Sequence, residues 1–133
     1  MEEIFAVFAV AQLRRTNLFC ATTRPDGTIG LPGGKVDQGE DIFQAVIREA
    51  GEEGWNLKCD RKILRTDIVD GKKVAWIKCY TMTTPVKSQW KEKYRGIFPL
   101  AIPVELLSTG MGNEFLNSKD ARGLLTLASF FSY

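Results

Sequence analysis

Histidine is absent from this sequence of 133 residues, and its absence excludes several kinds of active site. A Ser-His-Asp triad, an HExxH zinc site and a histidine general base all require the imidazole ring. An enzyme without histidine activates water most economically with a bound metal ion or with a carboxylate such as glutamate.

Cysteine is scarce, because Cys20, Cys59 and Cys79 are the three thiols and they lie far apart in the sequence. No CxxC pair occurs, so the pattern indicates neither a zinc knuckle nor a disulfide framework. Cys20 and Cys79 stand within apolar runs, where we expect small core residues. A reducing compartment, the cytoplasm, fits this usage.

Long apolar runs and a strong net charge are also lacking. The opening segment, MEEIFAVFAVAQLRR, has an apolar run too short to span a membrane and no basic start like that of a signal peptide. The net charge of +2 creates no overall field that favours nucleic acid or a lipid surface. We therefore expect neither a nucleic-acid polymer nor a membrane as a partner. The length and the hydrophobic fraction of 44% predict one globular domain over residues 1–133.

The chain shows a mixed pattern of strand and helix signals. The apolar run at residues 4–11 predicts a buried central strand with a hairpin partner at 18–22. The dipeptide Asp70-Gly71 predicts a tight hairpin turn. Other expected elements are strands at 28–31, 62–69, 73–84 and 95–100, a helical turn at 103–107 and a final helix from Ser118. Together they predict one α+β domain with a mostly antiparallel or mixed sheet.

Residues 31–57, LPGGKVDQGEDIFQAVIREAGEEGWNL, carry the clearest signal in the sequence. They predict a glycine-rich turn at 32–34 and then a helix over 42–53, which Asp41 caps and Gly54 ends. The predicted apolar stripe of this helix consists of Phe43, Val46, Ile47 and Ala50.

The predicted helix also carries a cluster of acidic residues. Glu49, Glu52 and Glu53 stand at positions i, i+3 and i+4, so their carboxylates share one face and repel each other. Such a cluster calls for a counter-charge, and three hard oxygen ligands suit Mg²⁺ or Mn²⁺. A metal site beside a glycine-rich turn favours a substrate with a chain of phosphates.

Two familiar glycine motifs do not fit this segment. A P-loop would need glycine at Ile29 and serine or threonine at Val36. A dinucleotide-binding fingerprint is excluded because no GxGxxG pattern follows a predicted strand.

The segment instead resembles the Nudix box, the signature of the Nudix hydrolase family. That pattern is Gly, five residues, Glu, seven residues, Arg-Glu, an aliphatic, any residue, Glu-Glu, any residue, Gly and an aliphatic. The matching residues are Gly34, Glu40, Arg48, Glu49, Glu52 and Glu53. The chain departs from the pattern at its end. Gly54 comes one place early, and Trp55 and Asn56 take the positions of the final glycine and aliphatic.

The resemblance implies the Nudix fold, in which a mixed sheet is sandwiched between helices, and hydrolysis of a pyrophosphate bond with Mg²⁺ or Mn²⁺. Water attacks phosphorus, and metal ions offset the phosphate charge. Glu40 is expected to be a supporting carboxylate, and Arg48 to hold the glutamates by charge-assisted hydrogen bonds. The resemblance assigns metal binding to the Gly33 or Gly34 carbonyl and to Glu49, Glu52 and Glu53.

Further site residues are less closely defined by the resemblance. Many Nudix enzymes take one more acidic ligand from a loop after the later strands, and Glu92 lies in a suitable loop. Lys35 is a candidate for phosphate contact, Trp90 for stacking on a nucleobase and Asn117 for reading the base. Three of them have an alternative reading: a surface charge for Glu92, a core aromatic for Trp90 and a helix cap for Asn117.

The substrate class follows from the same resemblance. We expect a nucleoside diphosphate linked to another group, with (deoxy)nucleoside triphosphates favoured because the chain is short. A dinucleoside polyphosphate or ADP-ribose is the alternative substrate, although the family's ADP-ribose marker is missing, since no proline occurs between Pro32 and Pro85. A non-catalytic nucleotide sensor is the alternative from another class. Nudix proteins often dimerise, so a homodimer is an alternative to a monomer.

Overall fold

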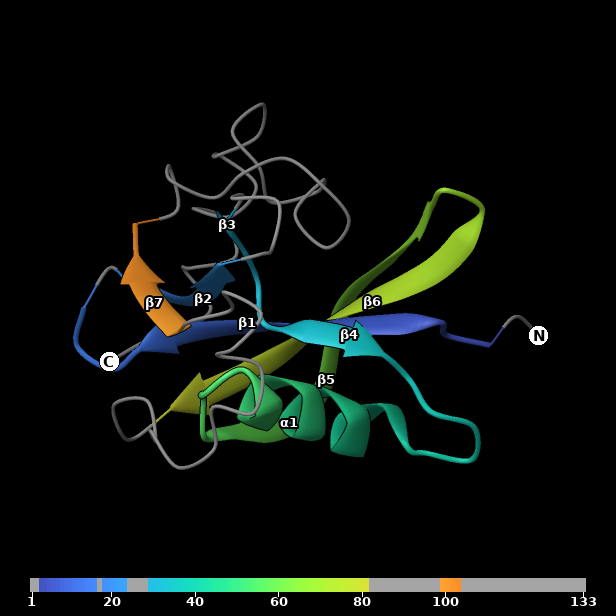
Figure 1. The fold of residues 1–133 in the computed structure, drawn as a ribbon, viewed down its shortest axis with the longest axis horizontal. Coiled ribbons are helices and arrows are strands. Elements are labelled where there is room, and N and C mark those ends of the chain that lie inside the picture. The colour runs from blue at the N-terminus through green and yellow to red at the C-terminus, as the bar shows by residue number, and fades with distance from the viewer. Residues whose placement is uncertain (1–2, 17, 24–28, 82–98, 104–133) are drawn as a thin grey trace.

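The computed structural model describes residues 3–16, 18–23, 29–81 and 99–103. In this part of the chain the strands form one sheet, and a helix lies beneath it in Figure 1. The predicted α+β organisation is thereby confirmed. The elements are β1 (Ala6–Leu13), β2 (Phe19–Thr23), β3 (Ile29–Gly30), β4 (Gly33–Lys35), α1 (Ile42–Glu52), β5 (Leu57–Val69), β6 (Lys72–Thr81) and β7 (Pro99–Ile102).

Strand β1 is the centre of the sheet. The strand order is β3-β2-β1-β6-β5, with β4 paired to β1 and β7 paired to β2. Strands β1 and β6 run parallel, whereas the other pairs are antiparallel, so the sheet is mixed. Strands β4 and β2 share one edge of β1: β4 pairs with its first residues and β2 with its last.

The side chains of β1 are buried on both faces of the sheet, as the period of two requires. Phe8 and Val10 join one core cluster together with Trp76, which is 0% exposed. Val7 and Ala9 join a second cluster, which lies between the sheet and α1. The continuous apolar run in the sequence therefore reflects a strand that is covered on both sides.

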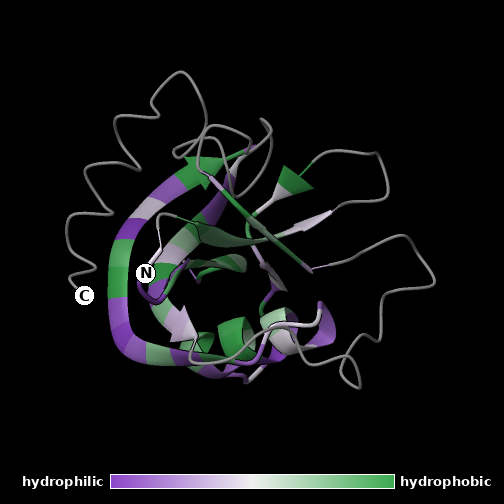
Figure 2. Cartoon of the chain, turned by 90° about the vertical axis from the view of Figure 1, so that its left-hand side faces the viewer, coloured by the Kyte–Doolittle hydropathy of each residue, from purple (hydrophilic) through white to green (hydrophobic). Residues whose placement is uncertain are grey.

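Strands β5 and β6 form the hairpin that Asp70-Gly71 predicts. Both turn residues have positive φ, 51° for Asp70 and 77° for Gly71, as a type I′ turn requires. Strand β5 begins at Leu57, earlier than the predicted start at residue 62. The sequence pattern does not show this start, because the first half of the strand is polar and its register shifts after Cys59 and again after Ile63. Figure 2 shows this long curved edge strand with both hydrophilic and hydrophobic stretches.

Helix α1 begins as predicted. Asp41 is its N-cap, with extended backbone (φ −68°, ψ 139°), and its Oδ1 accepts a hydrogen bond from the Phe43 amide at 2.6 Å. The prediction for Ile47 is wrong, since 40% of this side chain is exposed. The helix turns Ala45 toward the sheet instead, and its buried residues are Ala45, Val46 and Ala50.

The end of α1 is a Schellman motif. Glu53 is the C-cap, and Gly54 follows with φ 99°, which confirms the prediction of a left-handed glycine. The Gly54 amide donates to the Gly51 carbonyl at 3.1 Å, and the Trp55 amide donates to the Ala50 carbonyl at 2.8 Å. These two bonds satisfy carbonyl groups that the helix itself leaves without partners.

Trp55 completes this motif as the apolar residue after the glycine. The side chain is 1% exposed and belongs to the core cluster beneath α1. Its Nε1 donates to the Ala21 carbonyl of β2 at 2.7 Å. The early glycine and the unexpected tryptophan therefore form one unit, which ends the helix and ties its end to the sheet.

The prediction of a glycine turn at residues 32–34 is wrong for the two glycines. Gly33 and Gly34 belong to β4, and they pair antiparallel with Phe8 and Val7 of β1. Glycine has a low intrinsic preference for strands. The strand forms here because β1 supplies a pairing edge from a distant part of the sequence.

The later predictions are covered only in part. Strand β7 begins at Pro99, within the predicted strand 95–100, whereas residues 95–98 lie outside the described residues. Of the predicted helical turn at 103–107, only Pro103 is described. The predicted final helix from Ser118 lies outside the described residues. None of the described helices is long and apolar enough to cross a membrane.

Candidate active site

The glycines of β4 allow two backbones to come unusually close. A Cβ atom added to Gly33 would lie 2.1 Å from the Val7 carbonyl oxygen and 2.8 Å from Cα of Phe8. Both neighbours are backbone atoms of β1, which cannot give way without disturbing the sheet. Only glycine fits at this position, and β4 therefore lies closely against β1.

The same two glycines face the acidic end of α1. The Gly33 amide donates a hydrogen bond of 2.8 Å to Oε1 of Glu53. A Cβ atom on Gly34 would lie 2.5 Å from the carboxylate of Glu49. The structure thus brings the glycine pair and two of the three clustered glutamates into direct contact, across about 15 to 20 residues of sequence.

Arg48 lies at the centre of the charged groups. Its Nε donates to Oε2 of Glu40 at 2.7 Å and its Nη2 to Oε1 of the same carboxylate at 3.0 Å, a bidentate arrangement. Its Nη1 is 3.1 Å from Oε1 of Glu49 and 3.4 Å from Oε1 of Glu52. One guanidinium therefore contacts three glutamate carboxylates, and it offsets part of the charge of the clustered glutamates.

Two further groups complete the surroundings of Arg48. Its Nη2 donates to the Lys35 carbonyl at 3.1 Å and lies 3.4 Å from Oδ2 of Asp37. Since Lys35 ends β4 and Asp37 follows it, these contacts connect the loop before α1 to the middle of the helix. The loop is also closed on itself, because the Asp37 amide donates to Oε1 of Glu40 at 3.0 Å.

The shared guanidinium affects the carboxylates unequally. The hydrogen bond from Arg48 is the main reason that the pKa of Glu40 lies below its ordinary value. Burial raises the pKa of Glu49, and the repulsion from Glu52 adds to that effect, although Arg48 opposes both. The pKa of Glu49 is thus raised and that of Glu40 lowered, although the same guanidinium contacts both carboxylates.

The glutamates are not gathered around one point in this structure. Among the described residues, no three carboxylate, thiol or imidazole side chains lie closely enough together to hold a metal ion. Glu49 and Glu52 are directed to Arg48, whereas Glu53 is directed to the Gly33 amide. The donor set still fits a divalent cation in its chemistry: hard carboxylate oxygens, a desolvated charge on Glu49 and glycine backbone without side chains beside them.

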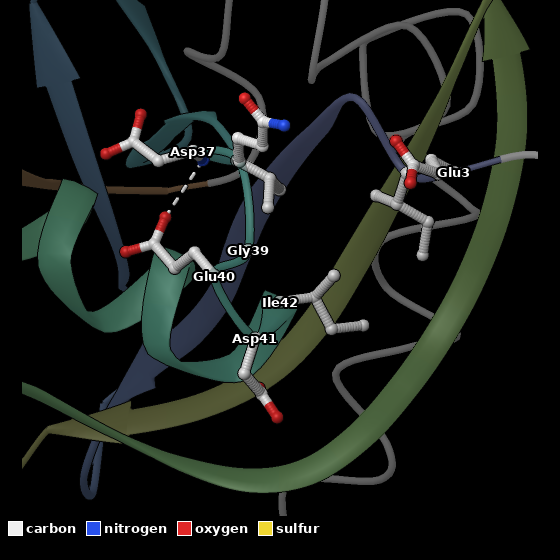
Figure 3. A pocket seen from close by; sticks show the side chains of 9 residues that line it. Glu3, Asp37, Gly39, Glu40, Asp41 and Ile42 are labelled. Carbon is white, nitrogen blue, oxygen red and sulfur yellow. Dashed lines mark hydrogen bonds between the residues drawn. The ribbon is translucent and has the colours of Figure 1, made fainter.

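A cavity of about 680 Å³ lies on the other side of the charged cluster. It is bordered by the loop before α1 and the first residues of the chain, and four carboxylates line it, those of Glu3, Asp37, Glu40 and Asp41 (Figure 3). Such a lining disfavours a phosphate group unless cations accompany it. We therefore place the candidate site at the glutamates and glycines and not in this cavity.

Comparison with known families identifies the arrangement. The sequence pattern of the NUDIX domain matches residues 4–96, which is more than half of the chain. This chain belongs to the Nudix hydrolase family. Among curated proteins, none matches it by sequence.

Solved structures of other proteins share the Nudix fold with this chain. A MutT structure (Aliivibrio salmonicida and Vibrio cholerae) is 19% identical with a TM-score of 0.63, and the match covers 93% of this chain and 98% of the other. An ADP-ribose pyrophosphatase from Streptococcus suis is 13% identical with a TM-score of 0.67, and the match covers 92% and 91%. The Ap4A hydrolase of C. elegans is 19% identical with a TM-score of 0.63, and the match covers 98% and 100%.

The remaining predicted residues of the Nudix site are placed unevenly. The ammonium of Lys35 lies 5.4 Å from the centre of the Phe5 ring, which Lys72 also approaches, at 4.2 Å. A phosphate contact by Lys35 therefore stays a prediction. Glu92, Trp90 and Asn117 lie outside the described residues.

Sequence reasoning missed two residues that shape the Nudix site. Asp37 contacts Arg48, and the only signal for it was its place in the short loop between Gly34 and Glu40. The signal for Trp55 is a glycine followed by a large apolar residue directly after a helix, which is a signature of the Schellman motif.

Proposed function

We propose that this Nudix hydrolase is a Mg²⁺-dependent pyrophosphohydrolase of nucleoside or deoxynucleoside triphosphates. The observation that supports it is the contact between the two halves of the box. Gly33 donates to Glu53, and Gly34 lies against the Glu49 carboxylate with no room for a side chain. A solvated acidic helix face would need neither contact.

In this proposal Glu49, Glu52 and Glu53 hold the divalent cation, with Mn²⁺ as a substitute for Mg²⁺, and the Gly33 carbonyl adds a backbone ligand. When bound, the cation offsets the negative charge of the phosphate oxygens and favours attack of water on phosphorus. Burial raises the pKa of Glu49, and a bound cation would offset this effect by favouring the charged form.

Arg48 is a positioning residue in this proposal. Glu40 fixes its guanidinium through two hydrogen bonds, and the remaining Nη1 is directed to Glu49 and Glu52. The repulsion between the two glutamates is thereby reduced before any cation arrives. Arg48 also opposes the rise that burial causes in the pKa of Glu49, since a nearby positive charge favours the charged form.

The choice of substrate follows from the solved neighbours and from one feature of the sequence. The solved neighbours include an ADP-ribose pyrophosphatase and an Ap4A hydrolase, so they support linked nucleoside phosphates as a class. The missing proline between Pro32 and Pro85 disfavours ADP-ribose. We therefore place nucleoside triphosphates first and dinucleoside polyphosphates second. The three cysteines are free thiols, which fits a cytoplasmic enzyme.

A nucleotide panel tests the proposal. The chain is incubated with nucleoside and deoxynucleoside triphosphates, ADP-ribose and dinucleoside polyphosphates, with Mg²⁺ or Mn²⁺, and phosphate and pyrophosphate release are followed. We expect pyrophosphate release from triphosphates only when a divalent cation is present. Tight nucleotide binding without hydrolysis of any member would contradict the proposal and favour a sensor.

A matched pair of variants tests the role of the glutamates. Glu53→Gln keeps an oxygen that accepts from the Gly33 amide but removes the charge. We expect kcat/KM to fall by at least about 100-fold, because loss of a residue that only supports a metal ligand already costs up to about that much. Asp41→Asn removes one charge from the same helix and keeps the cap acceptor, so it should retain activity. Wild-type activity of Glu53→Gln would refute the metal assignment.

A further inference from the structure

Cys59 and Cys79 face each other across the β5–β6 hairpin. They are direct partners in the antiparallel register, and both side chains lie at the core cluster beneath α1. Directly opposite residues in antiparallel strands have Cα atoms about 4.5 to 5.5 Å apart. Disulfides span Cα distances of about 4.4 to 6.8 Å. The backbone is therefore already suited to a cross-strand bond between these two sulfur atoms.

The sulfur of Cys59 accepts two hydrogen bonds. The Arg61 amide donates to it at 3.2 Å, and the Cys79 thiol donates from the opposite strand. The bond from Cys79 is the main cause that lowers the pKa of Cys59 to about 7, although burial and Asp60 oppose it. Cys59 is half-buried, whereas Cys79 is 0% exposed and its pKa is raised, so it keeps its proton. The two thiols are thus unequal, with the nucleophile on the accessible side.

The backbone beside Cys59 is irregular. The register of β5 shifts between Cys59 and Ile63, and Arg61, in this interval, has a left-handed conformation with φ 55°. The Arg61 side chain lies over the Phe43 ring at 4.7 Å and contacts Asp41 at 3.4 Å. An irregularity of this kind bends the strand and interrupts the ladder of hydrogen bonds beside Cys59.

We propose that Cys59 and Cys79 form a thiol–disulfide exchange site for a small oxidised disulfide. The Cys59 thiolate, its proton released to water, attacks one sulfur of the reagent RS–SR. A mixed disulfide forms and RS⁻ leaves. The sulfur of Cys79 then attacks Cys59, its proton passes to the second departing RS⁻, and the protein disulfide closes. The two cysteines lose two electrons and two protons in total, and RS–SR becomes two RSH.

Cys20 provides an internal comparison. It is 0% exposed on β2, and burial raises the pKa of its thiol. Strand β1 separates β2 from β6, so Cys20 and Cys79 are about two strand spacings apart, near 9.5 Å, beyond the reach of a disulfide. The site therefore consists of two of the three thiols, and it needs no hydrolase activity in order to operate.

The test uses the full folded chain with oxidised glutathione as the probe. After incubation and acid quenching, the denatured protein is alkylated with N-ethylmaleimide, and its intact mass and peptide map are measured. We expect one alkylated cysteine, Cys20, and a linked peptide pair containing Cys59 and Cys79. The intact mass should be two hydrogen atoms below that of the reduced chain carrying one N-ethylmaleimide. Three alkylated cysteines, a persistent glutathione adduct on Cys59, or a link to Cys20 would overturn the proposal.

Two variants sharpen this result. Cys20→Ala removes the comparison thiol and should leave the yield of the Cys59–Cys79 bond unchanged. Cys59→Ser should abolish the intramolecular product and leave both buried thiols available to alkylation after denaturation. The wild-type peptide map decides the question even if a variant does not fold, since it requires no substitution.

Discussion

The amide nitrogen of Gly33 lies 2.8 Å from Oε1 of Glu53, and this hydrogen bond joins strand β4 to the end of α1. Gly33 thus has no room for a Cβ against the backbone of β1, and it also donates to the candidate metal ligand. Substitutions around this contact therefore separate effects on folding from effects on activity.

Gly33→Ala should destabilise the fold. The added Cβ would lie 2.1 Å from the Val7 carbonyl oxygen, a backbone atom of the central strand, so β4 has to move away. We expect the free energy of unfolding to fall by about 3 kcal/mol, as for severe overpacking. Urea unfolding followed by circular dichroism measures it, and an unchanged midpoint would show that β4 is placed differently.

Gly34→Ala should act on activity instead. Its added Cβ would meet the Glu49 carboxylate at 2.5 Å, which is the end of a flexible side chain and can turn aside. The chain should fold, but a ligand displaced by about 1 Å should lower kcat/KM by roughly 100-fold. Activity close to wild type, measured on the best substrate of the nucleotide panel, would argue against a catalytic role for Glu49.

Gly51→Ala is the control for both glycine variants. Gly51 lies in the last turn of α1, and an added Cβ meets nothing within 4 Å. Alanine in a helix is favoured over glycine by about 0.5 to 1 kcal/mol, so the free energy of unfolding should rise by that amount. A loss of stability in the same urea experiment would mean that the helix ends before this residue.

Trp55→Phe tests the anchor at the end of α1. Phenylalanine keeps most of the apolar contact but removes the Nε1 donor to the Ala21 carbonyl. An unmatched buried acceptor costs about 1 to 3 kcal/mol, and we expect a loss of this size in the free energy of unfolding. Trp55→Leu removes the ring as well and should cost more; equal losses would show that the ring contributes little, and an unchanged stability of Trp55→Phe would show that the hydrogen bond contributes little.

The Glu40–Arg48 pair should make stability depend on pH. The pKa of Glu40 is lower in the folded chain than its ordinary value of 4.5, so folding favours the ionised form. This contribution is complete above about 4.5 and disappears as the pH falls through the lower folded value. The difference in free energy of unfolding between wild type and Glu40→Gln should therefore be present at pH 7 and shrink below pH 4; a constant difference would contradict it.

Local rules predicted the elements whose causes are local. The cap at Asp41, the turn at Asp70-Gly71 and the left-handed Gly54 depend on backbone conformations that neighbouring residues determine. The burial of β1 on both faces followed from its unbroken apolar run. The spacing of the six box residues likewise indicated the family that the domain match confirms.

Non-local causes explain the rest. Gly33 and Gly34 form a strand because a distant strand offers them an edge, and glycine itself gives no sign of it. The start of β5 was hidden because polar residues and register shifts interrupt its alternation. Ile47 fits the periodicity of the buried stripe, yet the orientation of α1 on the sheet decides otherwise.

The Schellman ending of α1 has a consequence for when conformational entropy is lost. The Glu53 amide is directed to the carbonyls at the end of the helix, and its φ of −95° and ψ of 6° are held between α1 and Gly54. Folding thereby fixes the backbone of this glutamate, a restriction that costs roughly 1 to 2 kcal/mol per residue. Only side-chain rotation then remains to be restricted when a ligand binds, so the association of a ligand with Glu53 is opposed by a smaller entropy loss than it would be on a frayed helix end.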